Sequence, residues 1–186
     1  MLVAVVGPSG AGKDTLMAVA RARIGPDGRF RFVRRSITRP AEAGGEDHEP
    51  MGREAFLARR DSGGFALWWE AHGLLYGVPR DVEADLAAGR CAVANLSRGA
   101  LAEAQARFPL LVLEITAPPE VLAARLAARG REGAADIAAR LAREAPLPPS
   151  LDARRVVNDG PPEEGAALVA NVLLEAAGRS RPVAGP

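Results

Sequence analysis

Residues 7–15, GPSGAGKDT, combine three glycines and a lysine at the spacing of a phosphate-binding loop. Glycine lets backbone N–H groups converge on phosphate oxygens, because a Cβ would block the approach or because φ must be positive. Lys13 is the only lysine of the chain, and it would place a full charge near the β- and γ-phosphates. The sequence therefore predicts a nucleoside triphosphate site formed by Gly7, Pro8, Ser9, Gly10, Ala11, Gly12, Lys13, Asp14 and Thr15.

An aspartate follows Lys13, where such loops usually carry the serine or threonine that holds Mg²⁺. Asp14 could bind the metal directly or through a water, because magnesium prefers hard oxygen ligands and retains several waters. Alternatively, Asp14 favours the helix N-terminus, an effect of ~0.3–1 kcal/mol, while Thr15 touches a phosphate. Both residues are therefore candidate metal ligands.

Five arginines lie on two consecutive helical stretches that follow the apolar segment LLVLEIT, residues 110–116. They could close a positive surface over the phosphates, since phosphoryl transfer depends on positioning and charge stabilisation. The alternative is a solvated charged face on an alanine-rich pair of helices. The arginines of this predicted lid are Arg125, Arg129, Arg131, Arg140 and Arg143.

Apolar strands and amphipathic helices that alternate along the chain must position these residues. This alternation predicts an α/β fold with a mainly parallel sheet covered by helices on both faces. We expect a single domain over residues 1–178 and a disordered tail over 179–186. Strands are predicted within 2–6, 30–38, 65–69, 91–96, 110–116 and 154–160, helices within 15–24, 53–63, 80–89, 118–130 and 161–178, and a polar loop over 39–52.

Composition excludes several classes of function. The 186 residues are 48% hydrophobic, which is enough for one sizeable core, and the net charge of +1 predicts no nucleic-acid or membrane partner. The opening MLVAVVGPSG has no basic segment and only a short apolar run, so we expect a cytoplasmic protein. Cys91 is predicted to be a buried hydrophobe. Monomer and homodimer both remain open.

Several motifs carry a resemblance over nearly the whole chain. GPSGAGK, SITRP, WWEAHGLLYG and the pair VLAARLAARGRE and DIAARLARE resemble the guanylate-kinase branch of P-loop kinases. KDTL, ITRPAEAGGEDH, HGLLYGV, NLSR, RGRE and VVNDG are more similar to the ribose 1,5-bisphosphate phosphokinases of phosphonate breakdown. That resemblance implies ATP-dependent phosphorylation of the 1-phosphate of ribose 1,5-bisphosphate, with Mg²⁺, giving 5-phosphoribosyl 1-diphosphate and ADP.

The resemblance also assigns roles to residues outside the loop. Arg129 and Arg140 match the family's lid arginines and would act with Lys13 in catalysis, while Arg131 would bind ATP. Arg39 is predicted to hold the acceptor's phosphate, because a planar guanidinium suits a phosphate bidentately. Further candidates for substrate binding are Glu46, Asp47, Tyr76, Asn95, Ser97 and Arg98.

Two positions depart from the guanylate-kinase pattern. Aligning HG and YG places Leu67 and Val78 where that family reads the guanine edge, and neither side chain can hydrogen-bond a base. The acceptor is therefore not expected to be GMP. His48 and His72 are not expected to act as general bases, because an acceptor phosphate is already an anion. The alternatives are another nucleoside monophosphate kinase and an inactive guanylate-kinase-like interaction module.

Overall fold

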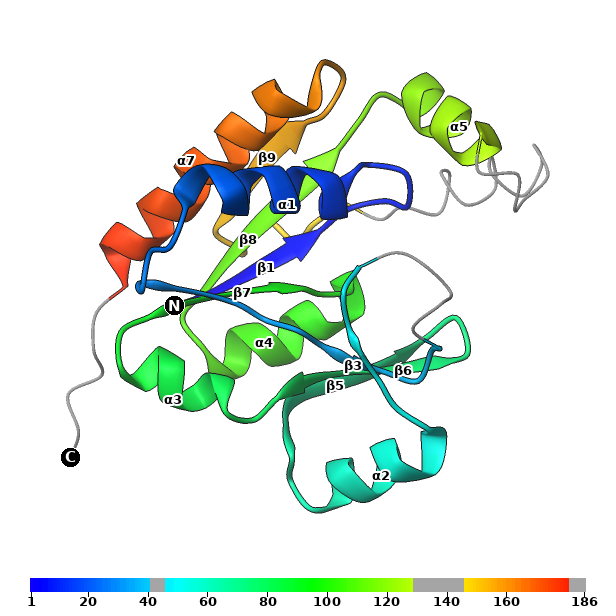
Figure 1. Cartoon of the computed structure of the whole chain (residues 1–186), viewed down its shortest axis with the longest axis vertical. Helices are drawn as coiled ribbons and strands as arrows, with labels where there is room; N and C mark the ends of the chain where they lie inside the picture. The colour runs from blue at the N-terminus through cyan, green and yellow to red at the C-terminus, as the bar shows by residue number, and fades with distance from the viewer. Residues whose placement is uncertain (41–45, 129–145, 181–186) are drawn as a thin grey trace.

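A five-stranded parallel sheet forms the centre of the molecule (Figure 1). The structure is a computed structural model that describes residues 1–40, 46–128 and 146–180. The strands are apolar throughout where they are buried on both faces, as in the central LVAVV strand. Their order is β2 (Phe30–Phe32), β7 (Cys91–Asn95), β1 (Leu2–Val6), β8 (Leu110–Thr116) and β9 (Ala153–Val157). The predicted α/β fold is confirmed.

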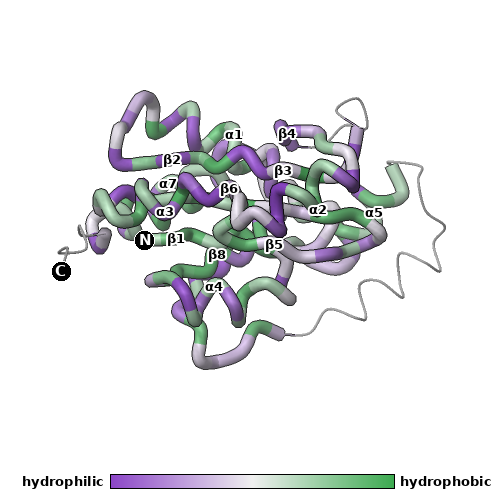
Figure 2. The backbone as a smooth tube through the Cα atoms, turned by 90° about the horizontal axis from the view of Figure 1, so that it is seen from below, coloured by the Kyte–Doolittle hydropathy of each residue, from purple (hydrophilic) through white to green (hydrophobic). Residues whose placement is uncertain are grey.

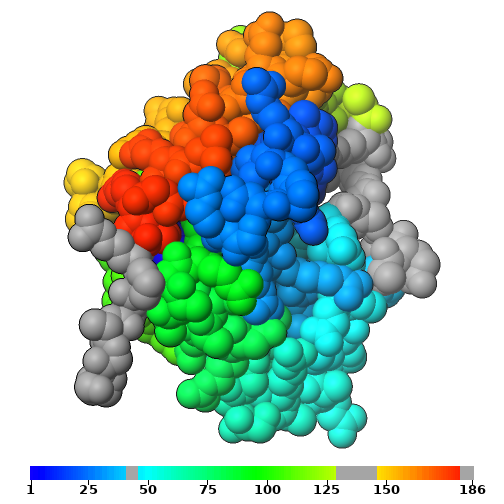
Figure 3. Space-filling view, turned by 60° about the vertical axis from the view of Figure 1, so that its left-hand side comes forward, coloured from blue at the N-terminus to red at the C-terminus, as the bar shows by residue number. Residues whose placement is uncertain are grey.

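Helices cover both faces of this sheet. Alternate residues of β1 enter two different cores, since Val3 and Val5 pack with α1 and α7 while Leu2, Ala4 and Val6 pack with α3 and α4. Figure 3 shows α7 lying beside α1 on one face of the molecule, and Figure 2 shows the apolar character of β1 and β8. The helices are α1 (Lys13–Ile24), α3 (Val82–Ala87), α4 (Leu101–Arg107), α5 (Pro119–Ala128) and α7 (Pro162–Arg179).

A second, four-stranded sheet is formed by strands between residues 36 and 79. Its order is β4–β3–β6–β5, and its strands β5 and β6 form a hairpin that turns at His72 and Gly73, both with positive φ. Leu67, Trp69 and Val78 of this hairpin belong to the same core as α3 and α4, which joins the two sheets. The elements are β3 (Ser36–Ile37), β4 (Glu49–Pro50), α2 (Arg53–Asp61), β5 (Phe65–Ala71) and β6 (Leu74–Pro79).

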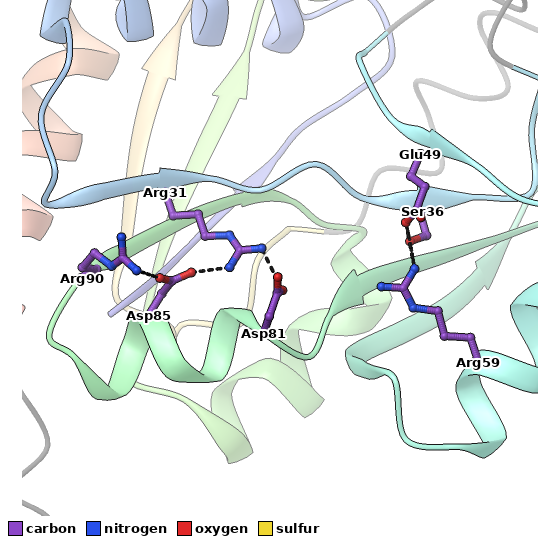
Figure 4. Close-up of polar contacts among 7 residues, drawn as sticks. All are labelled: Arg31, Ser36, Glu49, Arg59, Asp81, Asp85 and Arg90. Atoms are coloured by element: carbon purple, nitrogen blue, oxygen red, sulfur yellow. Dashed lines mark hydrogen bonds and ion pairs between the residues drawn. The ribbon is translucent and has the colours of Figure 1, made fainter.

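Hydrogen bonds and ion pairs between side chains connect the edge strands β2 and β4 to neighbouring elements (Figure 4). Arg31 of β2 and Arg90, which precedes β7, both pair with the buried Asp85 of α3. In the second sheet, Ser36 of β3 donates to Glu49 of β4 at 2.6 Å. The edges of both sheets are therefore held by side chains as well as by backbone pairing.

Several elements differ from the sequence prediction. The single strand predicted over 30–38 is two strands in different sheets, β2 and β3. The turn predicted at the start of YGVPR is strand β6, and helix α4 was not predicted. Helix α7 ends at Arg179, the first residue of the predicted tail, and Arg179 pairs there with Asp152 at 2.6 Å. Within the described ranges, no helix has the length and apolar character needed to cross a membrane.

Candidate active site

The glycine loop is shaped by contacts that exclude a side chain. Gly7 follows β1 with φ 144°, and a Cβ there would lie 1.8 Å from the carbonyl oxygen of Ile115 on the neighbouring strand. Gly12 precedes α1 with φ 83°, and its Cβ would lie 2.5 Å from Nδ2 of Asn158. Only glycine fits either position without a shift of backbone or core. The loop is therefore a close-packed turn that ends at a helix N-terminus.

Lys13 is the first residue of α1, two residues earlier than the predicted start of this helix. Its Nζ donates to the carbonyl oxygens of Gly7 and Pro8, at 2.7 and 2.8 Å. The ammonium thus lies across the start of the loop, while the amino end of α1 faces the same space. This arrangement of a charge and a helix N-terminus suits a phosphate anion.

Asn158 supports the loop from the far end of the sequence. Its buried Nδ2 donates to the carbonyl oxygen of Ala11 at 2.8 Å, and its backbone N–H donates to Thr116 at 2.7 Å. In the sequence, Asn158 stands out only as part of the VVNDG motif, with no predicted role. Its place immediately after a strand beside β8 is a signal that could have identified it, because strand ends of parallel sheets meet at one edge.

A hydrogen-bonded chain joins the phosphate loop to the predicted acceptor region. Asn95 ends β7, whose partner β1 leads into the loop, and its Nδ2 donates to Asp14 Oδ1 at 3.1 Å and to Glu46 Oε2 at 2.5 Å. These three predicted site residues therefore lie together. They line one cavity of about 280 Å³ with Asp47 and Arg21.

Arg35 is a member of this cluster that the sequence analysis missed. Its Nε and Nη2 both donate to Glu46 Oε1, at 2.9 and 2.5 Å. The guanidinium also lies over the rings of Trp69 and Tyr76, 5.5 and 5.2 Å from their centroids. Those two rings stack with centroids 5.5 Å apart. Tyr76, predicted to bind substrate, is thus connected to Glu46 through Arg35.

The two tryptophans separate as strand alternation requires. Trp69 is buried, whereas Trp68 is 38% exposed on the other face of β5. The guanidinium of Arg60 covers Trp68 at 5.0 Å. Only Trp69 belongs to the aromatic pair beneath Arg35, so only one of the two tryptophans is a core residue.

Arg39 and His48 form a second contact between β3 and the segment that follows residue 45. The ring nitrogens of His48 lie 3.0 Å from the carbonyl oxygens of Glu46 and Arg39, and Nδ1 lies 3.4 Å from Arg39 Nη2. Arg39 Nε is buried with no hydrogen-bond partner among the described residues. A buried guanidinium donor of this kind needs an acceptor, which an anionic ligand would supply. His48 is buried and serves to hold backbone.

Three predicted binding residues have other partners. Ser97 Oγ accepts a hydrogen bond from the backbone of Gly99 at 3.1 Å, within the turn of η2 (Arg98–Ala100). Arg98 pairs at 3.0 Å with the buried Glu114, which also accepts from Arg155. Asp47 pairs with the exposed Arg34 at 2.9 Å. Ser97 and Arg98 are absent from the lining of the cavity beside Asp14.

The predicted lid is represented in the structure by Arg125. Its Nη1 is buried without a hydrogen-bond partner in the described ranges, and it lies 4.0 Å from the position that a Cβ on Gly12 would take. This guanidinium therefore borders the phosphate loop. The remaining predicted lid residues, Arg129, Arg131, Arg140 and Arg143, lie outside the described residues.

The site suits a magnesium ion that arrives with its nucleotide. Among the residues that the structure describes, no group of three His, Cys, Asp or Glu side chains could hold a metal. Asp14 and Thr15 are both exposed at the start of α1, and the Asp14 carboxylate faces Asn95. One carboxylate with phosphate oxygens and waters is a usual donor set for Mg²⁺. The residues therefore fit the ion.

Curated proteins that share one enzymatic name are similar in sequence to nearly the whole chain. A ribose 1,5-bisphosphate phosphokinase PhnN from Acidiphilium cryptum is 51% identical over 173 residues, covering 93% of this chain and 92% of the relative. The PhnN from Agrobacterium fabrum is 44% identical over 183 residues, covering 97% of this chain and 100% of the relative. A bifunctional ribose 1,5-bisphosphokinase-thymidine phosphorylase from Azorhizobium caulinodans is 54% identical over 173 residues, but this chain spans only 25% of its length.

Solved structures show the fold alone. The crystal structure of guanylate kinase from Anaplasma phagocytophilum aligns with a TM-score of 0.65 at 22% identity, covering 94% of this chain and 84% of that one. No family model matches the chain. The structural likeness places the fold among guanylate-kinase-like P-loop kinases, as the motifs implied.

Proposed function

Because the chain belongs to the ribose 1,5-bisphosphate phosphokinase family, we propose that it transfers the γ-phosphoryl group of ATP to the 1-phosphate of ribose 1,5-bisphosphate. An oxygen of the 1-phosphate forms the new bond to phosphorus as the bond to the leaving ADP oxygen breaks. The products are 5-phosphoribosyl 1-diphosphate and ADP. The feature of the site that best supports this reaction is the chain from Asp14 through Asn95 to Glu46, because it joins a nucleotide loop to an acceptor region.

The phosphate loop would bind the triphosphate of ATP. Its backbone N–H groups and the start of α1 stabilise the phosphates, and Lys13 can exchange its carbonyl contacts for the charged oxygens of the β- and γ-phosphates. Arg125, whose buried Nη1 lies beside Gly12, would add a second charge. Arg129, Arg131 and Arg140 would complete the positive surface over the transferring group.

Magnesium would be held by Asp14, with Thr15 as the alternative ligand. When bound, the ion neutralises phosphate charge and aligns the terminal phosphate for transfer. Asn95 would orient the Asp14 carboxylate through the bond that it already makes to Oδ1. The buried, unpaired Nε of Arg39 would bind the acceptor's phosphate. Glu46 and Asp47 would face the sugar hydroxyls, and no general base is required.

A substrate panel tests this proposal. The purified chain with ATP and Mg²⁺ should convert ribose 1,5-bisphosphate to 5-phosphoribosyl 1-diphosphate, with little turnover of GMP, AMP or dTMP. Rapid turnover of GMP with none of the sugar bisphosphate would establish a nucleoside monophosphate kinase instead. The buried Leu67 and Val78, which pair across β5 and β6, argue against that alternative because they offer no polar group to a base.

A further inference from the structure

We propose that Arg35 binds the phosphate of the acceptor that is not phosphorylated, and so selects a sugar bisphosphate over a sugar monophosphate. This inference rests on the proposed function. Nucleotide binding accounts for the loop, and Arg39 accounts for one acceptor phosphate. An acceptor with two phosphates requires a second positively charged side chain, held at a fixed distance from Arg39, to bind the second phosphate.

Arg35 and Arg39 flank the same short strand, β3. Arg35 is part of the backbone pairing, because its carbonyl accepts from Glu49, and the strand continues through Ile37. Arg35 immediately precedes β3 and Arg39 follows it by two residues, so one short strand carries both guanidinium groups. The bond from Ser36 to Glu49, shown in Figure 4, holds this strand in place. Two cations are thereby presented in fixed order along one element.

Two residues of one short segment, Glu46 and His48, hold the two arginines. Glu46 accepts from the Nε and Nη2 edge of Arg35, and His48 contacts both the carbonyl and the guanidinium of Arg39. His48 also contacts the carbonyl of Glu46. We call residues 46–48 the acceptor segment. It fixes the spacing of the two cations, which is what a site for two phosphates must do.

The guanidinium of Arg35 keeps one edge for a ligand. Both of its bonds to Glu46 use a single carboxylate oxygen, and Nη1 makes no hydrogen bond to any residue in the described ranges. A phosphate can accept from the Nη1 and Nη2 edge while Glu46 retains the other edge. The side chain is 11% exposed and lies on the Trp69 and Tyr76 rings, so its charge is weakly screened.

The surroundings of Arg35 leave few other ligands for the inner end of the site. Leu67 and Val78 are fully buried and apolar, and Ser36 is bound to Glu49. Leu67 and Val78 therefore offer no hydrogen-bonding group to the edge of a base. A compact anion attached to a sugar would meet the guanidinium of Arg35 at the edge that Glu46 does not occupy. The phosphate at this end would therefore be recognised by charge and by the planar fork of Arg35.

The experiment compares Arg35→Gln with Arg34→Gln, the adjacent exposed arginine that pairs with Asp47. Each purified variant is assayed with ribose 1,5-bisphosphate and with ribose 1-phosphate. Arg35→Gln should raise KM for the bisphosphate roughly 10- to 100-fold, because a charge-assisted bond contributes about 1.5–3 kcal/mol. KM for ATP and kcat/KM for ribose 1-phosphate should stay within about twofold of the unaltered chain. Arg34→Gln should leave all three values unchanged.

A loss of kcat/KM by the same factor for both sugars would overturn the proposal, since it would indicate a purely structural role for Arg35. An unchanged preference for the bisphosphate would also overturn it. If Arg35→Gln fails to fold, Arg35→Lys replaces it in the same assays. A KM that rises for the bisphosphate while kcat/KM for ribose 1-phosphate is unchanged supports the proposal. A loss of kcat/KM by the same factor for both sugars contradicts it. Absence of bisphosphate turnover by the unaltered chain would instead reject the proposed function, and this subsite with it.

Discussion

At the scale of single residues, the site depends on side chains that hold one another in place. Asn95 is neutral and donates to two carboxylates, Asp14 and Glu46, which lie on different segments. A carboxylate at this position would repel both partners, whereas an amide attracts them. The Asp14 carboxylate is therefore oriented by an amide at the end of a neighbouring strand.

Replacing Asp14 by Asn tests whether this carboxylate binds the metal. If it does, Asp14→Asn should raise the Mg²⁺ concentration needed for half-maximal activity about tenfold or more, because a charged hard ligand is lost. The measurement is a magnesium titration at saturating ATP and acceptor. An unchanged titration curve, with helix stability lowered by ~0.3–1 kcal/mol, would favour the helix-dipole interpretation instead.

Gly12 and Asn158 should be energetically coupled. Gly12→Ala adds a Cβ that lies 2.5 Å from Asn158 Nδ2 and strains a residue with φ 83°. Asn158→Ala leaves the carbonyl of Ala11 without its buried donor, at a cost of about 1–3 kcal/mol. The double variant should lose less stability than the sum of the single variants, because the clash is gone.

Urea unfolding of the four proteins measures this coupling. Gly28→Ala is the matched control, since a Cβ there meets nothing within 4 Å. It should leave both stability and ATP affinity unchanged. Strict additivity of Gly12→Ala and Asn158→Ala would show that the two residues do not interact in solution.

Residues whose role is set by sequence-local chemistry were predictable, and those set by tertiary contact were not. The loop glycines and Lys13 follow from spacing, because the whole motif lies within nine residues. Arg35 looks like one of many surface arginines until β3 places it over Trp69 and Tyr76. Asn158 acquires a role only when β9 pairs with β8. Arg98 was a reasonable candidate at a strand end, but its partner Glu114 is set by sheet register.

At the scale of elements, the central strands were predictable and the second sheet was not. A continuous apolar run identifies β1 and β8, which are buried on both faces. The alternation of FRFVRRSIT continues across the point where the chain leaves one sheet for the other, so it gives no sign of the break. Gly77 and Pro79 lie within β6, and in the sequence these two residue types suggest a turn. Glycine is required at position 77 because a Cβ would lie 2.5 Å from the Phe65 ring.

The pairing of β3 with β4 predicts a pH-dependent contribution to stability. The hydrogen bond from Ser36, and then that from Arg59, lowers the pKa of Glu49 below its usual 4.5. A lowered folded pKa means that the carboxylate stabilises the fold above pH 4.5, and that this contribution disappears as the pH falls through the folded pKa. Glu49→Gln should therefore cost about 0.5 kcal/mol near neutral pH, as for other partly exposed pairs, and almost nothing in acid.

Thermal unfolding of Glu49→Gln and the unaltered chain across a pH series checks this expectation. Ser36→Ala should also flatten the pH dependence, because it removes the larger of the two interactions. A stability difference between Glu49→Gln and the unaltered chain that is the same at every pH would contradict the assignment to the charged carboxylate.

At the scale of the whole molecule, the binding regions come from distant parts of the chain and converge at the end of the parallel strands. The phosphate loop follows β1, the acceptor segment precedes β4, and Asn158 follows β9. Each lies near the C-terminal end of a strand or between the two sheets (Figure 1). This is the edge at which open α/β sheets bind ligands, because loops there can vary without altering the core.

Cys91 reports on the integrity of the main sheet. It is fully buried at the start of β7, and burial raises the pKa of its thiol to about 11. At pH 8 the folded protein should therefore react with Ellman's reagent only through unfolding. Saturating ATP with Mg²⁺ at about 100 times Kd should slow labelling roughly 100-fold, because it stabilises the folded state by about 2.7 kcal/mol.

The rate of labelling in guanidinium chloride provides the reference for a fully accessible thiol. Labelling of the native protein at that same rate would show that β7 opens locally. A rate unaffected by ATP would show that the opening does not involve the nucleotide site.

The bond between Asn158 and the carbonyl of Ala11 joins positions 147 residues apart. On the ribosome, the glycine-rich turn is therefore translated early, whereas the amide that braces it emerges only after nearly all of the two sheets. The strand that leads into the turn likewise lacks its partners until β7 and β8 have been translated. Capture of nucleotide in its final geometry is thus postponed until translation has passed β9.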